Sequence, residues 1–216
     1  LRGMAHLARR HAGGVRLTAT QNLLLRFVAA TAVPPVYDTL SALGLAGAGA
    51  ERLVDVTRCP GAESCLSAIA RPRGLAAAVE RLCHNGLSPM ADWPLSVKIS
   101  GCPNACGHHH IADIGCFGVA VKAGDRHIPC YQLLVGGLTQ ADRTVFGKRL
   151  IRIPARRTPE ALKRLVMCYR DRKQAEEPFA AFVERVGLDP LAATLADLAD
   201  ISSAAADESL WCDLGT

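Results

Sequence analysis

The cysteines of this chain include two tight pairs, and this arrangement restricts the fold more than any other feature of the sequence. Five residues separate Cys59 from Cys65, and three separate Cys102 from Cys106. The first cysteine of each pair follows a short apolar run typical of a strand and directly precedes a proline. Proline suits the first turn of a helix, so each pair is predicted to lie on a strand-to-helix loop, near a helix N-terminus that favours negative charge.

Four thiolates that approach from two such loops suit a cubane iron–sulfur cluster. The spacing differs from that of zinc sites, whose paired ligands are usually separated by about two to four residues, and from the close cysteine run of small ferredoxins. On spacing alone, zinc binding and coincidence both remain open. Gly61 and Gly101 are expected to let the backbones approach and to leave N–H groups free for the sulfurs. The other cysteines are predicted to be buried structural thiols: Cys83, Cys116, Cys130, Cys168 and Cys212.

Composition excludes several classes of protein. Half of the 216 residues are hydrophobic and 21% are charged, which suits a packed core in one large or two small domains. No apolar run approaches the roughly 18 residues of a membrane span. The Arg-rich stretches at 149–157 and 163–173 lack aromatic strands beside them, so nucleic-acid binding is not expected. The net charge of +5 suits an anionic substrate or an acidic electron donor.

The start of the chain shows no secretory signal, and the cysteine pattern fits a reducing compartment, so we expect a cytoplasmic protein. The chain begins with leucine and runs almost at once into a strand-like segment. We therefore expect a fragment of a longer polypeptide that lacks its amino-terminal part.

The hydrophobic pattern predicts a mixed α+β fold. Strands are expected within 15–28, around a polar centre at 18–22, and at 53–56, 95–99, 115–121 and 128–135, the last two forming a hairpin. Helices are expected at 35–43, 62–70, 75–83, from Thr158 (as N-cap) onward, 179–186 and 191–198. The last dozen residues are expected to form a polar tail.

The segment Lys-Ile-Ser-Gly-Cys-Pro-Asn-Ala-Cys-Gly-His-His-His-Ile-Ala-Asp-Ile-Gly at 98–115 closely resembles the sirohaem and [4Fe–4S] half-domain of sulfite and nitrite reductases, as does Tyr-Gln-Leu-Leu-Val-Gly-Gly at 131–137. Residues 55–65 look like the first ligand pair of that family, and residues 16–23 are similar to the strand pair of the preceding ferredoxin-like repeat. The resemblance is weaker from 150 to 216. It implies the carboxy-terminal part of a ferredoxin-like repeat at 1–48, a cofactor domain with a mixed sheet flanked by helices at 49–205, and a tail at 206–216.

The resemblance assigns all four paired cysteines to a [4Fe–4S] cluster and makes Cys106 the bridge to the iron of sirohaem. It places Asn104 near the macrocycle. The side chains of Arg16, Gln21 and Asn22 become candidates for contacts to the carboxylates of sirohaem, which suit Arg forks and amide donors. Arg16 could instead be a surface strand residue, and Gln21 and Asn22 could simply form a turn.

Other polar residues receive structural interpretations. The histidines at 108–110 are expected to support or pack against the site, because axial ligation by Cys106 leaves no ligand role for them. Lys98 is expected to be a residue of a strand face.

The resemblance implies six-electron reduction of sulfite to sulfide, or of nitrite to ammonia, with a ferredoxin or flavoprotein as electron donor. It supports no catalytic residue in this chain, because the family's anion-binding Arg and Lys side chains lie largely in the amino-terminal half. Two other classes remain open: an iron–sulfur electron-transfer module without sirohaem, and a tetrapyrrole-modifying oxygenase similar to precorrin-3B synthase.

Overall fold

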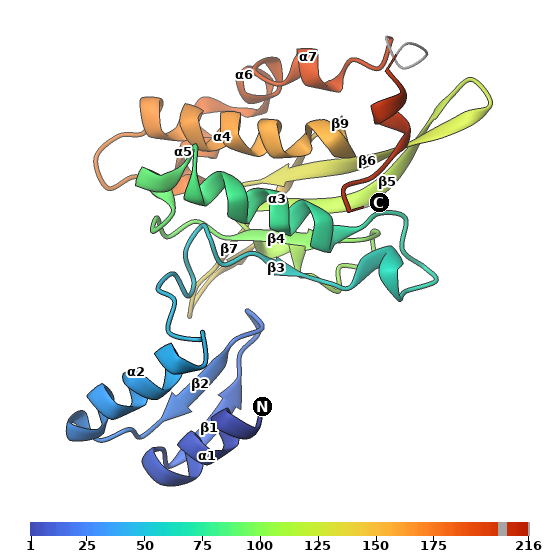
Figure 1. Cartoon of the computed structure of the whole chain (residues 1–216). Helices are drawn as coiled ribbons and strands as arrows, with labels where there is room; N and C mark the ends of the chain where they lie inside the picture. Colours follow the sequence, from blue (N-terminus) through green and yellow to red (C-terminus); the bar gives the residue numbers. More distant parts are fainter. Residues whose placement is uncertain (203–206, 216) are drawn as a thin grey trace. The chain divides into compact units, whose positions relative to one another are not determined.

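The chain folds into two compact units, residues 1–50 and 51–216 (Figure 1). The computed structural model describes residues 1–202 and 207–215. Both units combine helices with strands, which confirms the predicted α+β class. In the described part of the chain, no helix combines the length and the apolar character needed to cross a bilayer. The domain limits expected at 48 and 205 remain a prediction.

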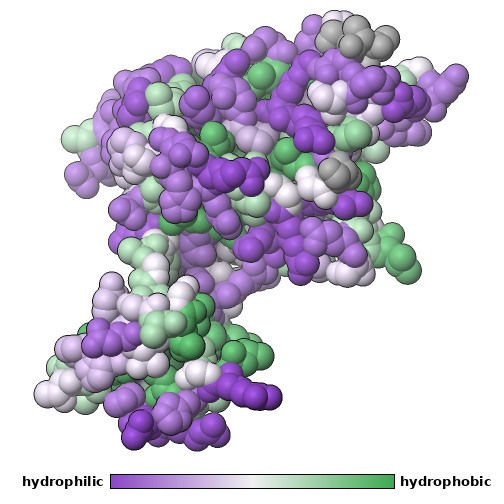
Figure 2. All heavy atoms as spheres, in the orientation of Figure 1, coloured by the Kyte–Doolittle hydropathy of each residue, from purple (hydrophilic) through white to green (hydrophobic). Residues whose placement is uncertain are grey.

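The first unit contains a two-stranded hairpin and two helices. Strands β1 (Gly14–Leu17) and β2 (Leu23–Arg26) pair antiparallel around a turn in which the hydroxyl of Thr18 accepts from the backbone N–H of Asn22. Helix α2 (Val33–Ala42) confirms the helix expected at 35–43. Helix α1 (Arg2–His11) was not predicted, because only Leu7 of its ten residues is buried. Figure 2 shows hydrophobic spheres gathered on this unit, whose exposed apolar residues include Leu17, Leu24 and Phe27.

The second unit is organised by a five-stranded sheet with the order β3-β4-β5-β6-β9. Strands β3 (Thr57–Arg58), β4 (Val97–Ser100) and β5 (Ile114–Ala123) run parallel, and β6 (Arg126–Val135) and β9 (Lys148–Pro154) continue antiparallel. The β5–β6 hairpin confirms the prediction, and Gly124 takes the left-handed conformation (φ 61°) that its tight turn requires. Strands β7 (Leu138–Thr139) and β8 (Thr144–Val145) form a small separate hairpin.

One face of the sheet is covered by helices α3 (Pro72–His84) and α4 (Thr158–Arg172) (Figure 1). The row Ile99, Cys116 and Leu133 points into this apolar core. Successive side chains of a strand point to opposite faces. The neighbouring row Ser100, Phe117, Gln132 and Arg152 therefore lies on the other face, as do Lys98 and Thr57. This second face is polar, although Thr57, Lys98, Ser100 and Gln132 are all buried.

Several elements differ from the prediction. Residues 53–56 form no strand, since 53 and 54 belong to a turn, and the first strand of the sheet begins at Thr57. Residues 62–70 form no α-helix: the N–H of Ala62 donates to the carbonyl of Ala70, and the N–H groups of Ile69 and Ala70 donate to the carbonyl of Gly101. Helix α5 (Phe179–Val186) is confirmed, whereas 191–198 holds the end of α6 (Leu188–Ala193) and all but the last residue of α7 (Ala196–Ala199). Thr158 does not cap α4, because its hydroxyl donates to the carbonyl of Pro154.

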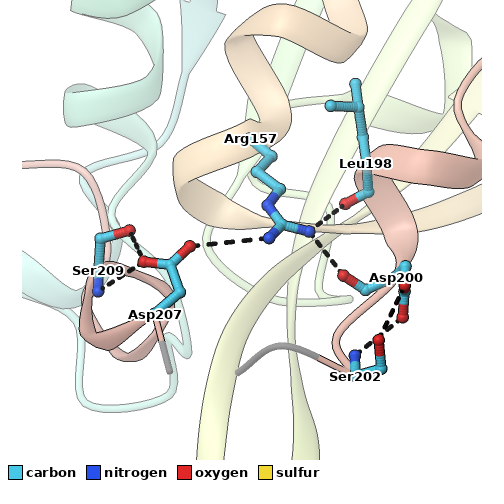
Figure 3. A network of polar contacts seen from close by, with 6 residues as sticks. All are labelled: Arg157, Leu198, Asp200, Ser202, Asp207 and Ser209. Atoms are coloured by element: carbon cyan, nitrogen blue, oxygen red, sulfur yellow. Dashed lines mark hydrogen bonds and ion pairs between the residues drawn. The ribbon is translucent and has the colours of Figure 1, made fainter. Parts of the chain in front are cut away.

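The segment expected to be a polar tail packs against the sheet over residues 207–215. Leu210 is buried beside Ile128 and Cys130, and the carboxylate of Asp213 accepts from the backbone N–H of Arg71 at 2.6 Å. Residues 206 and 216 of the expected tail lie outside the described residues. The Arg157 guanidinium joins the start of this segment to the end of α7 (Figure 3). It donates to the carbonyls of Leu198 and Asp200 and pairs with the carboxylate of Asp207.

This geometry predicts that Arg157→Met lowers the free energy of unfolding by about 1–2 kcal/mol, because two carbonyls lose a charged donor. Urea denaturation measures the change. Arg170→Met is the matched control, since Arg170 pairs only with its exposed neighbour Asp171 among the described residues, and its loss should leave the midpoint unchanged. Equal midpoints for the two variants would show that Arg157 does not hold the segment.

Candidate metal centre

The two cysteine pairs follow neighbouring parallel strands. Cys59 comes directly after β3, and Cys102 comes two residues after β4. Because β3 and β4 run parallel, both loops leave the same edge of the sheet. The backbone N–H of Cys59 donates to the carbonyl of Ile99 at 3.1 Å, which extends the pairing of the strands to the first cysteine. The prediction that each pair follows a strand is therefore confirmed.

Gly101 ties the two loops together. Its backbone N–H donates to the Sγ of Cys59 at 3.1 Å, and its carbonyl accepts from the N–H groups of Ile69 and Ala70 at 2.8 and 3.0 Å. One residue of the second loop thus holds both ends of the segment that carries Cys65. The expected role of Gly101, an N–H donor to a cysteine sulfur, is present in the structure.

Close backbone contact explains why glycine occupies 61 and 101. A Cβ on Gly101 would lie 2.9 Å from the Cα of Gly61 and 3.0 Å from the carbonyl oxygen of Ala70. Gly61 has φ 64°, and a Cβ there would lie 2.1 Å from Pro72. The backbones of the two loops meet where any larger residue would separate them.

The expected helix N-termini are absent from the described residues around each pair. Cys59-Pro60 leads into a single 3-10 turn, Gly61–Glu63, and Cys102 is followed by turns. Short turns suffice here because the segment after the first pair returns to bond with Gly101, and the segment after the second pair returns to bond with Ser100. At Cys59, favourable polarity at the sulfur therefore comes from a single N–H group and not from a helix dipole.

The four cysteines differ in exposure. Cys59 and Cys102 are buried, each with 8% of its surface accessible, whereas Cys65, Cys106 and Asn104 are exposed. No three Cys, His, Asp or Glu side chains of the described residues meet as ligands of a single ion. A cubane does not need such a meeting point, because its thiolates bind four separate irons. None of the four thiols forms a disulfide. The close approach of Gly61 to Gly101 and the N–H donor to the Sγ of Cys59 fit a cluster bound by thiolates.

The loop around Cys106 is held in an unusual conformation. Ala105 and His108 have φ angles of 60° and 59°, in the left-handed region that residues other than glycine rarely adopt. Gly107 lies against β4, since a Cβ there would lie 2.1 Å from the carbonyl oxygen of Ile99. Backbone strain of this kind persists where surrounding contacts enforce it, and it often marks functional sites.

The histidine run packs on the polar face of the sheet. His109 is fully buried, its ring centroid lies 4.8 Å from that of Phe117, and its Nδ1 lies 2.8 Å from the hydroxyl of Ser100. Burial, with a smaller contribution from His110, lowers the pKa of His109 to about 4. His110 is half-buried and His108 is exposed. His109 therefore has the packing role expected for this run.

Lys98 lies on the same face and is buried rather than at the surface. Its ammonium donates to the hydroxyl of Thr57 at 3.3 Å. Burial lowers the pKa of Lys98, and this effect outweighs the negative charges of Asp55, Asp113 and Glu51, which raise it. Gln132 accepts from Arg152 on the neighbouring strand β9. This face can thus hold polar groups away from water.

The candidate sirohaem contacts outside the cysteine loops belong to the first unit. Arg16 is exposed on β1, opposite Leu24. Gln21 has φ 66° and its N–H bonds to the carbonyl of Thr18, while Asn22 bonds to the hydroxyl of the same residue. These bonds support the interpretation of Gln21 and Asn22 as turn formers. Contact of the Arg16, Gln21 and Asn22 side chains with a macrocycle remains a prediction.

The other cysteines divide by burial. Cys83, Cys116 and Cys130 are buried, as predicted, and burial raises the pKa of Cys83 to about 11. Cys168 is half-buried and Cys212 is exposed, so the prediction was wrong for Cys212, which lies at the end of a 3-10 turn.

Sequence reasoning also missed Ser100 and the hydroxyl of Tyr131, which is buried and finds no partner among the described residues. Neither belongs to a spacing pattern that could have revealed it.

Comparison with known proteins agrees with this geometry. The family described as "Nitrite and sulphite reductase 4Fe-4S domain" matches residues 49–200, and "Nitrite/Sulfite reductase ferredoxin-like half domain" matches residues 1–43. The chain is 33% identical to the sulfite reductase [NADPH] hemoprotein beta-component of Acidithiobacillus ferrooxidans, covering 88% of this chain and 33% of that protein. It is 28% identical to the ferredoxin–nitrite reductase of Synechococcus elongatus, covering 72% and 30%. The structure of the NirA protein of Mycobacterium tuberculosis matches with a TM-score of 0.72 and 27% identity, covering 88% of this chain and 36% of that one.

The chain therefore belongs to the nitrite and sulphite reductase family. Its two matched parts are the ferredoxin-like half domain and the 4Fe-4S domain, in that order. The chain spans about a third of the length of the curated relatives it matches.

Substituting Gly101→Ala should separate the two cysteine loops and lower the free energy of unfolding by about 1–3 kcal/mol, as overpacking usually does. Gly86→Ala is the matched control, because a Cβ there meets nothing closer than 3.7 Å. Thermal denaturation of both variants checks the prediction. A Gly101→Ala protein as stable as Gly86→Ala would contradict the close contact.

The lowered pKa of His109 makes stability depend on pH. The unfolded chain takes up the proton below about pH 6.5, whereas the folded protein keeps the imidazole neutral down to about pH 4. The free energy of unfolding should therefore decrease, by up to about 3 kcal/mol, as the pH falls from 6.5 to 4. Urea titrations across this range should show a shallower slope for His109→Phe, and an unchanged one for the exposed His84→Gln. Parallel profiles for the wild type and His109→Phe would disprove the assignment.

Proposed function

We propose that this chain is the cofactor-binding part of a sirohaem-dependent sulfite or nitrite reductase, with a [4Fe–4S] cluster on Cys59, Cys65, Cys102 and Cys106. The observation that carries the proposal is the junction at Gly101, which joins the loops of both pairs and donates an N–H group to the Sγ of Cys59. Hydrogen bonds to cysteine sulfurs help to set the potential of such clusters. The family match over residues 49–200 supports the same cofactor.

The buried and the exposed cysteines would hold the cluster in different ways. Cys59 and Cys102 would anchor the cluster in the protein, whereas the exposed Cys65 and Cys106 would complete it at the surface of the second unit. Cys106 would be shared with the sirohaem iron, and the exposed Asn104 would lie near the macrocycle. When bound, the two groups supply one-electron transfer to the substrate, for six-electron reduction of sulfite to sulfide or of nitrite to ammonia.

The remaining assignments follow the resemblance. Arg16, Gln21 and Asn22 would bind carboxylates of sirohaem through guanidinium and amide donors. The proposed electron donor is a flavoprotein or a ferredoxin, since relatives are named for NADPH and for ferredoxin. The proposed substrate is a small anion, sulfite or nitrite. No residue of this chain is proposed as catalytic, and the complete polypeptide is proposed as the enzyme.

The test is anaerobic reconstitution with iron, sulfide and sirohaem, followed by ultraviolet–visible spectra and iron and sulfide assays. We expect a Soret band with the red-shifted visible band of sirohaem, and about four irons per chain in the cluster. Cys106→Ser should lose the coupling between the two groups, whereas Cys212→Ser, at an exposed cysteine outside the pairs, should keep it.

Each alternative class predicts a different result. Iron and sulfide without the tetrapyrrole would favour an electron-transfer module. Zinc bound in place of both would rule out the reductase proposal for this chain. Oxidation of an added precorrin, without reduction of sulfite or nitrite by the complete polypeptide, would favour the tetrapyrrole-modifying oxygenase.

A further inference from the structure

A buried hydroxyl–imidazole pair stands beside the Cys106 loop. The Oγ of Ser100 accepts the backbone N–H of Gly107 at 3.0 Å and lies 2.8 Å from the Nδ1 of His109. Ser100 is 1% exposed and His109 is not exposed at all. Because Gly107 directly follows Cys106, this bond holds the peptide group that joins the proposed bridging cysteine to its neighbour.

The imidazole of His109 is held through one ring nitrogen. The Oγ of Ser100 accepts from Gly107 through one lone pair, and the Ser100 hydroxyl shares a second hydrogen bond with the Nδ1 of His109, whose direction depends on the tautomer of the ring. The other ring nitrogen, Nε2, is buried and has no hydrogen-bond partner among the described residues.

Packing alone does not explain a histidine at this position. An unpaired buried polar atom destabilises the fold. A phenylalanine could stack on Phe117 as His109 does without burying such an atom. What histidine adds is a hydrogen bond to the hydroxyl of Ser100, which fixes that oxygen with a lone pair directed at the N–H of Gly107.

The position of the Cys106–Gly107 peptide also depends on this pair. Ala105 and His108 hold left-handed conformations on either side, and Gly107 lies against the carbonyl of Ile99. Such a strained loop would relax without a bond to hold it. The bond from Gly107 to Ser100 supplies that hold from the end of β4.

We propose that Ser100 and His109 are positioning residues that fix the direction of the Cys106 side chain by holding the Cys106–Gly107 peptide on β4. The inference rests on the proposed function for the importance of that direction, since a bridging thiolate must reach two irons at once. Neither residue needs to touch a cofactor. Their effect passes through the backbone of the cysteine loop.

The first measurement is amide hydrogen exchange at Gly107 in the chain as purified. Ser100→Ala should accelerate exchange there by roughly five- to tenfold, through loss of one hydrogen bond, and His109→Phe should accelerate it less. Ser100→Thr keeps the hydroxyl and should restore protection. Thr158→Val is the matched control, because it removes a buried hydroxyl bonded to the carbonyl of Pro154, and it should leave Gly107 unchanged.

The second measurement is the magnetic coupling between the haem iron and the cluster in the reconstituted protein, by Mössbauer and electron paramagnetic resonance spectroscopy. Ser100→Ala and His109→Phe should keep wild-type iron and sulfide content but lose most of the coupled fraction. Ser100→Thr and Thr158→Val should retain it. A merely structural role would instead lower stability and iron content together and leave the coupling of the remaining sites intact.

The outcomes separate this inference from the proposed function. A wild-type chain that binds no sirohaem would count against the proposed function, and exchange at Gly107 would then decide alone whether the pair holds the peptide. Wild-type exchange at Gly107 in both Ser100→Ala and His109→Phe would overturn the inference. Full coupling in both variants, beside a coupled wild type, would overturn it as well.

Discussion

The last residues of β4 and the glycine after them hold both cysteine loops of the candidate site. Ile99 accepts the N–H of Cys59, Ser100 accepts the N–H of Gly107, and Gly101 bonds both to the Cys59 sulfur and to the returning chain at Ile69 and Ala70. Cys102 follows directly. Three consecutive residues thus connect the surroundings of all four cysteines. The sheet supports this junction, because β4 lies between β3 and β5 and is buried along its whole length.

The two faces of the sheet differ in the side chains that they bury. Helices α3 and α4 bury apolar side chains on one face, which gives the second unit its core. The opposite face buries Thr57, Lys98, Ser100 and Gln132, which an isolated structural sheet would gain little by burying. Polar groups sheltered from water interact more strongly with charge than exposed ones do. A face of this kind suits the cofactors proposed for this chain.

The sequence alone predicted those parts of the fold that local patterns determine. The β5–β6 hairpin follows from alternation around the turn at Gly124, and β4 follows from the apolar run before Cys102. The apolar run at 53–56 before Cys59 forms no strand, and β3 begins only at Thr57. The helix expected at 62–70 was wrong, because its N–H groups at Ile69 and Ala70 bond to Gly101, about thirty residues along the chain. The Ser100–His109 pair escaped notice for a similar reason: it forms only when a loop folds back onto its strand.

The parallel pairing of β3 with β4 has a consequence for how the proposed cluster would bind. In small zinc domains the metal organises a chain that is otherwise unfolded. Here the sheet and its two helices hold the cysteine loops through contacts of the protein itself, so little conformational entropy would be lost when the proposed cluster binds. Removal of the proposed cluster should therefore leave the fold of the second unit in place.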